Sequence, residues 1–362
     1  MMPNNASPTP LVSVVLAVFN EAAYIRNCMD SLLAQQTPGF SIEILAIDGG
    51  STDGTRQYLD SVAAQHPHVR VLSNPHRKAP FAFNIGLRES LGEYVCIFGS
   101  HTFYRQDYIA VCLRELLAKG AAGCGGRVLT VPASEKLQAR LVAYATSHSF
   151  GSSAKSFRTQ PEGYADLVNY MLLRKQAVLD AGGYSEVLLR NQDNDLNQKL
   201  RANGHRLYCT WQTECLYHPQ STLGALFRHA YRCGFWNLLS FKANRASMSL
   251  YHFVPFFFVL ALAASAVLSV VGLLSANPWL RLLALSFPAL LLLHLGAGAL
   301  ASLQVFAQKK SPAALLLPFV FFGFHFSYGL GTLVALISGA AISKSRHPTA
   351  PSEPELTKRF AS

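Results

Sequence analysis

The chain has 362 residues, which is enough for one sizeable α/β domain and an appended unit. Its net charge of +11 is not arranged as a basic stripe with interleaved aromatic residues, which argues against nucleic acid as a partner. Residues 1–245 hold 24 Lys/Arg and 18 Asp/Glu, whereas residues 246–343 hold three basic residues and no acidic residue. This asymmetry separates a water-facing part from a lipid-facing part.

Strand and helix signals alternate in the first half of the chain. Buried strands are expected at residues 11–18, 42–47, 69–72 and 94–98, and helices at residues 21–35, from the turn at 48–54 to residue 62, and at 79–91. This alternation predicts right-handed βαβ units and a mostly parallel sheet. Ligands of such sheets bind beyond the carboxyl ends of the strands, where Asn20, Glu21, Asp48 and the segment 99–101 are expected to lie.

The second half contains three long apolar stretches, each able to cross a hydrocarbon core of roughly 30 Å. They run from about residue 253 to 275, 282 to 306 and 313 to 342. If the first half is cytosolic, the Lys309–Lys310 loop is also inside, as the positive-inside rule expects, but the basic tail then lies outside. A re-entrant or split segment near Pro288 or Pro318 is an alternative to three simple spans.

Composition divides the chain into four parts. Residues 10–220 are expected to form the α/β domain, 221–250 an amphipathic interfacial segment, 251–343 a transmembrane region of about three helices, and 344–362 a flexible tail. Four basic residues precede the first apolar span and suit anionic headgroups of membrane lipids: Arg228, Arg232, Lys242 and Arg245. The seven cysteines form no Cys-x-x-Cys pair, so buried thiols in a reducing compartment are expected. Because the N-terminus lacks a basic n-region, a cleaved signal peptide is not expected.

Two motifs carry a resemblance to a known family. Val14-Val-Leu-Ala-Val-Phe-Asn-Glu21 and Ile47-Asp-Gly-Gly-Ser-Thr-Asp-Gly54 resemble the opening of family 2 glycosyltransferases of the GT-A fold. The resemblance extends through Gln192–Asp195, Arg228–Trp236 and His325–Gly331, and is nearest to membrane-attached bacterial exopolysaccharide transferases of the succinoglycan type. It implies a Rossmann-like α/β domain that uses a nucleotide-diphosphate sugar.

The donor side is expected to use residues near the strand ends. Asp48 can accept hydrogen bonds from a base or ribose, although the same segment also reads as a capped turn. In the resembled family the matching aspartate holds the base, and the glutamate matching Glu21 lies near the ribose. Lys78 follows two further basic residues and either meets a diphosphate or belongs to a solvated loop. The full expected set is Val18, Asn20, Glu21, Asp48, Lys78, Asn84 and Ser100.

The segment that holds the metal in the resembled family, here residues 99–101, departs from the family pattern. The fourth strand normally ends in Asp-x-Asp or Asp-x-His, but here it reads Gly99-Ser100-His101. Gly99 has no side chain with which to hold a metal. His101 remains the single candidate ligand, and imidazole suits Mn²⁺ better than Mg²⁺. A phosphate hydrogen bond without metal, or a structural role, are the alternatives for His101.

The acceptor side is expected around Asp193, which matches the family's general base. Gln192 replaces an acid and so removes a like charge beside Asp193. Asp195 is either a second functional acid or, as we favour, a helix N-terminal cap. Three residues further along line the acceptor site or lie on the membrane surface: Tyr231, Arg232 and Trp236. The Q-x-x-R-W motif of processive relatives is missing, which disfavours a polymer synthase.

The resemblance and the membrane region together predict an inverting glycosyltransferase. We expect it to move one sugar from a nucleotide-diphosphate sugar to a lipid-linked (polyprenyl-diphosphate) saccharide in exopolysaccharide or cell-surface glycan synthesis. Its expected place is the inner (plasma) membrane, multi-pass, with a cytosolic catalytic domain. A polyprenyl-phosphate sugar synthase is the first alternative. A catalytically weak membrane scaffold, suggested by Gly99, is the second.

Overall fold

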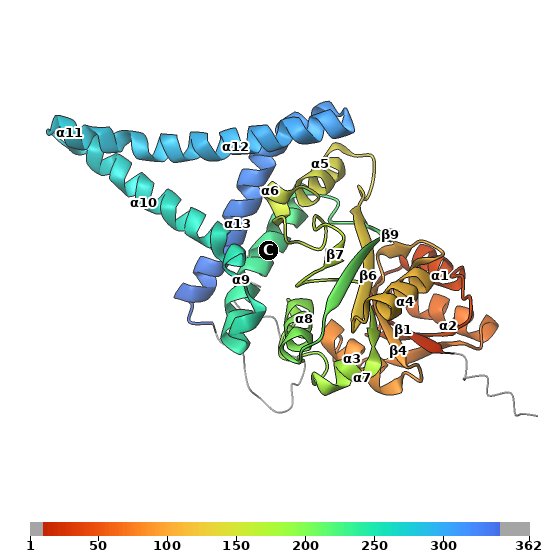
Figure 1. Cartoon of the computed structure of the whole chain (residues 1–362). Coiled ribbons are helices and arrows are strands. Elements are labelled where there is room, and N and C mark those ends of the chain that lie inside the picture. The colour runs from red at the N-terminus through yellow and green to blue at the C-terminus, as the bar shows by residue number, and fades with distance from the viewer. Residues whose placement is uncertain (1–9, 341–362) are drawn as a thin grey trace, which may run out of the picture. The chain divides into compact units, whose positions relative to one another are not determined.

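The computed structural model describes residues 10–340, so the tail 344–362 and the end of the third apolar stretch lie outside the described residues. The chain forms two compact units (Figure 1). Among the described residues, the first contains 10–129 and 160–217, and the second contains 130–159 and 218–340. Residues 130–159, which composition had grouped with the α/β domain, therefore fold with the apolar helices.

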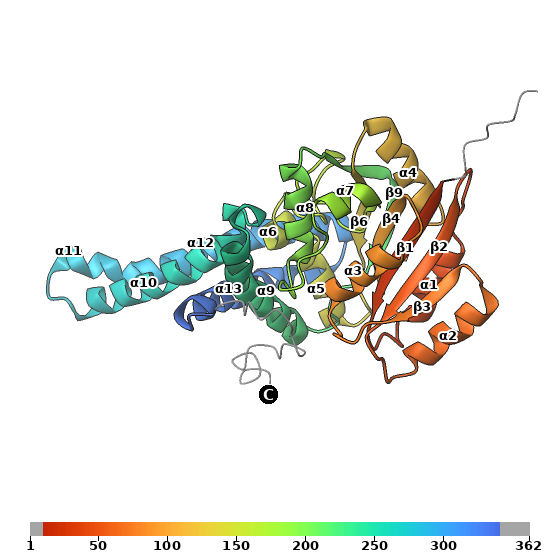
Figure 2. The same cartoon turned by 90° about the horizontal axis from the view of Figure 1, so that it is seen from below.

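The first unit is built on one mixed sheet with the strand order β3-β2-β1-β4-β8-β6-β9-β5, and β7 pairs with β9. The first four strands are parallel, and β8 is antiparallel to both β4 and β6. Figure 2 shows β1, β2 and β3 side by side. The strands are β1 Leu11–Val18, β2 Ser41–Asp48, β3 Val69–Ser73, β4 Tyr94–Gly99, β5 Thr102–Tyr104, β6 Gly123–Thr130, β7 Gly163–Tyr164, β8 Leu172–Arg174 and β9 Leu207–Tyr217.

Helices cover both faces of the parallel strands. The consecutive residues Val14 and Val15 on β1 point to opposite faces of the sheet and are both fully buried, as a strand between two helical layers requires. On one face, Val15 packs in a core with Ala82 of α3 and Leu196 of α8. The helices of this unit are α1 Ile25–Leu33, α2 Thr55–Gln65, α3 Ala79–Glu89, α4 Tyr108–Lys119, α7 Lys175–Asp180 and α8 Gln192–Ala202. The mostly parallel α/β fold predicted from the sequence is confirmed.

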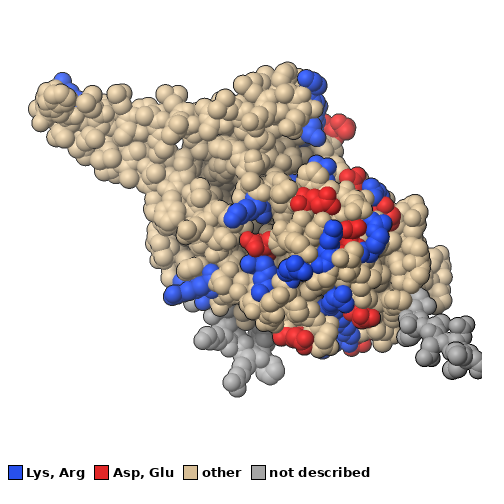
Figure 3. All heavy atoms as spheres, in the orientation of Figure 1, with Lys and Arg blue, Asp and Glu red and all other residues tan. Residues whose placement is uncertain are grey.

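The second unit contains three helical stretches long and apolar enough to span a membrane. They are Leu250–Leu274, Pro278–Lys309 and Pro312–Ile337, with mean hydropathy of 2.6, 1.9 and 1.7. The surface of α10 and α12 is almost free of charge (Figure 3). The helices are α5 Leu137–Thr146, α6 Ser149–Ser152, α9 Leu223–Ala243, α10 Val254–Leu274, α11 Pro278–Arg281, α12 Ser286–Lys309 and α13 Leu317–Ile337, with 3₁₀ turns at Arg245–Ser247, Leu250–Phe253, Leu282–Leu285 and Pro312–Leu316.

The two prolines that suggested a broken span lie in first turns instead. Pro288 is the third residue of α12, and Pro318 is the second residue of α13. The first turn tolerates proline because its N–H groups have no partner within the helix. Both helices therefore run on without interruption.

Helix α9 packs closely along α13 through glycines (Figures 1 and 2). A Cβ placed on Gly234 of α9 would lie 1.8 Å from the Tyr328 carbonyl oxygen, and one on Gly331 of α13 would lie 2.0 Å from the Tyr231 carbonyl oxygen. Close backbone approach at small residues is the packing mode of membrane helices. Helix α9 is thereby fixed to a candidate span.

Helices α5 and α6 join the same packing. Leu141 and Val142 of α5 share a core with Leu226 of α9 and Val320 of α13. In addition, His325 of α13 forms a hydrogen bond through Nε2 to the Phe150 carbonyl oxygen of α6, at 2.9 Å. The His325 Nδ1 atom lies 3.0 Å from His294 Nε2 on α12. These contacts explain why residues 130–159 belong to the second unit.

Candidate active site

Hydrogen bonds connect the two N-terminal motifs at the carboxyl ends of β1 and β2. The Asn20 N–H donates to Ser51 Oγ at 2.9 Å, and the Asn20 side-chain oxygen accepts from the Thr52 N–H at 2.9 Å. The Glu21 N–H donates to Thr55 Oγ1 at 2.9 Å. Asn20 itself has a left-handed φ of 55°, so the first helix begins at Ile25 and not at Glu21. Asn20 thus organises the loop with its side chain.

Asp48 is buried at the end of β2 and caps its own loop. Its carboxylate accepts hydrogen bonds from the Gly50 N–H at 3.1 Å, the Ser51 N–H at 3.2 Å and the Ser51 hydroxyl at 2.6 Å. A carboxylate offers about four acceptor positions. The Asp48 loop therefore has the geometry of a capped turn. Its carboxylate can accept about one further hydrogen bond.

A cavity of about 310 Å³ opens beside these loops. It brings together residues from the ends of β1 and β4 and from the start of α3, including the expected residues Val18, Glu21, Lys78, Ser100 and His101, and also Arg77. Asn84 does not line it. Its side-chain oxygen accepts from the Tyr184 N–H and its NH₂ donates to the Tyr184 carbonyl, both at 2.9 Å, so Asn84 fastens α3 to a neighbouring loop.

Glu21 and His101, which both line the cavity, form a contact with each other. His101 Nδ1 lies 3.1 Å from Glu21 Oε2, and the His101 side chain is 45% exposed. A carboxylate at Nδ1 fixes the proton there, which leaves the lone pair on Nε2 for another partner. No group of three His, Cys, Asp or Glu side chains that could hold a metal occurs among residues 10–340. A metal here would have His101 as its protein ligand and the remaining ligands from elsewhere.

Asp193 lies in the first turn of α8, whose N-cap is Asn191 at a φ of 60°. The Asn169 side-chain NH₂ lies 3.4 Å from Asp193 Oδ2, and Asn197 donates to the Asp193 carbonyl at 2.7 Å. The neighbouring Gln192 Oε1 is buried without a hydrogen-bond partner among the described residues. Asp195 is not the helix cap that we favoured from the sequence: it is the fourth residue of α8 and pairs with Lys199 at 2.7 Å.

Burial raises the pKa of Asp193 to about 6. If Asp193 accepts a proton during turnover, kcat/KM should fall tenfold per pH unit below about pH 6, where the carboxyl is protonated. Folding stability should change in the opposite direction, since a raised carboxyl pKa stabilises the protonated folded state between about pH 4 and 6. A pH–rate profile with thermal melts over the same range tests both. A profile flat down to pH 5 would contradict this role.

The three remaining expected residues belong to the second unit. Tyr231, Arg232 and Trp236 all lie on α9. Trp236 is buried, with 8% of its surface exposed, whereas Tyr231 and Arg232 are half-buried. Trp236 therefore has mainly a packing role within its own unit.

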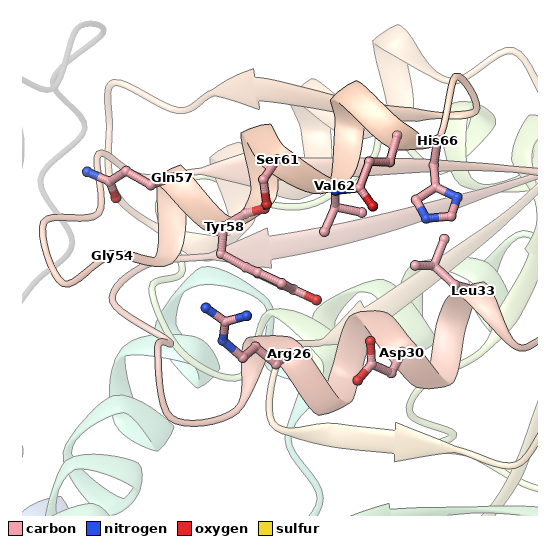
Figure 4. Close-up of a pocket in the computed structure, with 10 residues that line it drawn as sticks. Arg26, Asp30, Leu33, Gly54, Gln57, Tyr58, Ser61, Val62 and His66 are labelled. Carbon is pink, nitrogen blue, oxygen red and sulfur yellow. The ribbon is translucent and has the colours of Figure 1, made fainter.

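A second cavity, of about 490 Å³, lies between α1 and α2 (Figure 4). It is lined by polar side chains such as Arg26, Asp30 and Gln57, and the Arg26 guanidinium lies 4.5 Å from the centre of the Tyr58 ring. None of the residues expected from the sequence lines it. It is therefore separate from the Glu21–His101 cavity.

The chain is similar to several known proteins. The family model described as "Glycosyl transferase family 2" matches residues 13–182. The succinoglycan biosynthesis protein ExoA of Rhizobium meliloti is 30% identical over 269 residues, covering 73% of this chain and 80% of ExoA. A dolichyl N-acetyl-α-D-glucosaminyl phosphate 3-β-D-2,3-diacetamido-2,3-dideoxy-β-D-glucuronosyltransferase of Methanococcus voltae is 24% identical over 346 residues, covering 92% of this chain and 99% of that protein.

Among solved structures, the mannosyltransferase PcManGT of Pyrobaculum calidifontis, in complex with GDP-Man and Mn²⁺, has a similar fold. The TM-score is 0.53 at 20% sequence identity, and the match covers 92% of this chain and 87% of that one.

Proposed function

Because this chain belongs to glycosyl transferase family 2 and is a glycosyltransferase, we propose that it moves one sugar, with inversion, from a nucleotide-diphosphate sugar to a lipid-linked saccharide. The observation that carries this proposal is the cavity at the carboxyl ends of β1 and β4. There a carboxylate-held imidazole and two cations surround a space of about 310 Å³. Such an arrangement suits a diphosphate flanked by a nucleoside.

On the donor side, Asp48 would take the one further hydrogen bond that its carboxylate can accept, from the base. Arg77 and Lys78 would compensate the charge of the diphosphate, since both line the cavity and no metal-binding cluster occurs among the described residues. Asn20 would act through the loop it holds. Asn84, which is occupied by Tyr184, would support the donor site only indirectly.

On the acceptor side, Asp193 would act as the general base. Its carboxylate takes the proton of the acceptor hydroxyl while that oxygen attacks the anomeric carbon, and the bond from the anomeric carbon to the diphosphate breaks on the opposite side. Inversion follows from this single displacement. The pKa of about 6 suits the task, because the group is ionised at neutral pH yet more basic than an ordinary aspartate.

A divalent metal, Mn²⁺ in preference to Mg²⁺, would bind at His101 Nε2 and supply charge for the departing diphosphate. The residues fit such a site because Glu21 holds Nδ1 and the imidazole remains exposed. PcManGT, which has a similar fold, is bound to Mn²⁺ in its structure.

His101→Ala should abolish the Mn²⁺ enhancement of nucleotide binding and leave binding without metal within about twofold. The variant would lose the proposed metal ligand. It would keep Arg77 and Lys78, which are proposed to bind the diphosphate without metal. Titration of UDP and GDP into the full-length protein, with Mn²⁺ and with a chelator, measures it. His66→Ala serves as the control, since His66 lines the other cavity. If His101→Ala retained the full Mn²⁺ effect, His101 would not be the ligand.

The acceptor is proposed to be membrane-bound because three apolar helical stretches follow the catalytic unit. The relative from Methanococcus voltae has a dolichyl-linked sugar phosphate in its name. We place the protein in the plasma membrane of its cell, multi-pass, with the catalytic unit in the cytosol, where nucleotide sugars are made. Arg228, Lys242 and Arg245 would face anionic headgroups.

Product analysis separates the proposed reaction from its alternative. The purified protein is supplied with radiolabelled nucleotide sugars and either polyprenyl phosphate or a polyprenyl-diphosphate saccharide. The proposal expects a glycosidic linkage on the saccharide. A product in which the sugar is attached directly to the lipid phosphate would instead establish a polyprenyl-phosphate sugar synthase.

A further inference from the structure

Gly99 stands where the family pattern has an aspartate. A side chain at this position would point toward Tyr170. A Cβ built on Gly99 would lie 3.2 Å from Tyr170 Cε1 and 3.9 Å from the Tyr170 hydroxyl oxygen. A carboxylate needs three more heavy atoms beyond Cβ. The Cβ contact is already tight, so an aspartate in this position would crowd the Tyr170 ring, which would have to shift.

Thr102 also lies beside the position of a side chain on Gly99. Thr102 Oγ1 would lie 3.5 Å from a Cβ on Gly99, and this hydroxyl is fully buried without a hydrogen-bond partner among the described residues. A carboxylate on residue 99 would have been a natural acceptor for it. The Thr102 hydroxyl thus lacks the acceptor that an aspartate would supply here, and the Tyr170 hydroxyl lies beside the same spot without bonding to Thr102 Oγ1.

Tyr170 is held in place at a conformational cost. Its φ is 53°, in the left-handed region that a bulky residue rarely adopts. The Tyr108 hydroxyl, itself fully buried, donates to the Tyr170 carbonyl at 2.9 Å and accepts from the Gly126 N–H at 2.9 Å. Strained backbone persists only where the surroundings fix it, and it is frequent at binding sites.

The residue before Tyr170, Asn169, contacts the proposed general base. The Asn169 NH₂ lies 3.4 Å from the Asp193 carboxylate, and the buried Asn169 Oδ1 has no partner among the described residues. Asn197 of α8 bonds to both the N–H and the carbonyl of Val168, at 3.0 and 3.2 Å. One short segment, residues 168–170, thus contacts both the Gly99 corner and the proposed base.

We propose that Tyr170 is a donor-contact residue that replaces the missing aspartate, with its phenol hydroxyl bonding to the ribose–diphosphate part of the nucleotide sugar. This rests on the proposed function of the cavity, which Gly99 lines and which Tyr170 borders through its place beside Gly99. A phenol is uncharged at neutral pH, so the exchange removes one negative charge from a corner that must accept an anion. Donor binding then depends less on a divalent metal than it does with two carboxylates.

Four proteins test this by titration of UDP and GDP into the full-length chain, with Mn²⁺ and with a chelator. Tyr170→Phe, which removes only the hydroxyl, should weaken binding about tenfold, the worth of one good hydrogen bond. Gly99→Asp should bind at least tenfold more weakly because the Tyr170 ring would have to shift. Gly99→Asp with Tyr170→Gly should recover binding and require Mn²⁺, since glycine accepts the positive φ. Tyr164→Phe, at an exposed tyrosine of β7, is the control and should bind as the parent does.

The outcomes distinguish the proposal from its premise. Unchanged binding by Tyr170→Phe, or parental binding by Gly99→Asp, would overturn the role of Tyr170 while leaving the donor site intact, provided that Asp48→Asn weakens binding. If the folded parent protein bound neither nucleotide, the donor site itself would be refuted. Recovery in the double variant, with new metal dependence, would support the exchange of phenol for carboxylate.

Discussion

Asp193→Asn should lower the rate of sugar transfer by about 10²- to 10⁴-fold, the usual contribution of a general base. The amide keeps the shape of the side chain and can no longer take a proton. Nucleotide affinity should stay within about twofold, because Asp193 does not line the cavity beside Glu21. Transfer to the proposed lipid-linked acceptor measures the rate, and titration of UDP or GDP measures the affinity.

Stability gives this prediction a second, independent readout. Since burial penalises the ionised carboxyl and raises its pKa to about 6, the uncharged amide should keep or raise the melting temperature at neutral pH. Asp166→Asn removes an equal charge at a side chain that is 73% exposed, and should leave both activity and melting unchanged. An active Asp193→Asn enzyme would refute the base assignment. An unchanged cellular phenotype would favour the scaffold alternative.

Gly234→Ala should disrupt the packing of α9 on α13 and reduce the yield of folded protein sharply. The new methyl group would lie 1.8 Å from the Tyr328 carbonyl oxygen, an atom of rigid helical backbone that cannot rotate away. Overpacking of this kind costs about 1–3 kcal/mol or more. Thermal melting in detergent, followed by size-exclusion chromatography, measures the loss.

Gly296→Ala is the matched control for this variant. Gly296 lies in the interior of α12, and a Cβ there would meet no atom within 4 Å. The control should melt at or slightly above the parent temperature, because alanine favours helices over glycine by about 1 kcal/mol. Equal melting of the two alanine variants would show that the α9–α13 contact is not tight in the folded protein.

Local sequence patterns predict only the parts of the fold that they themselves specify. The apolar runs of β1 and β2, followed by Asn20-Glu21 and Asp48, define both the strands and the loops between them, because a strand buried on both faces is a continuous apolar segment. The three candidate spans follow from the length of the apolar stretches and their lack of charge. The start of α1 at Ile25 does not, since it depends on bonds from Asn20 and Glu21 to residues more than 30 positions away.

In the candidate site, too, local patterns predict some residues, whereas others depend on contacts between distant parts of the chain. Glu21, Lys78 and His101 were expected together and line one cavity. Asn84 was expected there as well, but its amide is bound by the backbone of Tyr184, a partner 100 residues distant that no spacing rule reveals. Tyr170 lies in no recognised motif. The only hint was the departure at Gly99, and a missing side chain does not say which other residue fills its space.

The membership of α5 and α6 in the second unit bears on how this enzyme can be produced. Cutting the chain after residue 217, a natural choice for a water-soluble catalytic fragment, removes α9 and α13. Leu141, Val142 and Tyr144 would then lose the apolar surface that buries them, in a segment that cannot be deleted without breaking the catalytic unit between residues 129 and 160. Such a fragment should aggregate. Purification therefore calls for the whole chain in detergent or lipid nanodiscs.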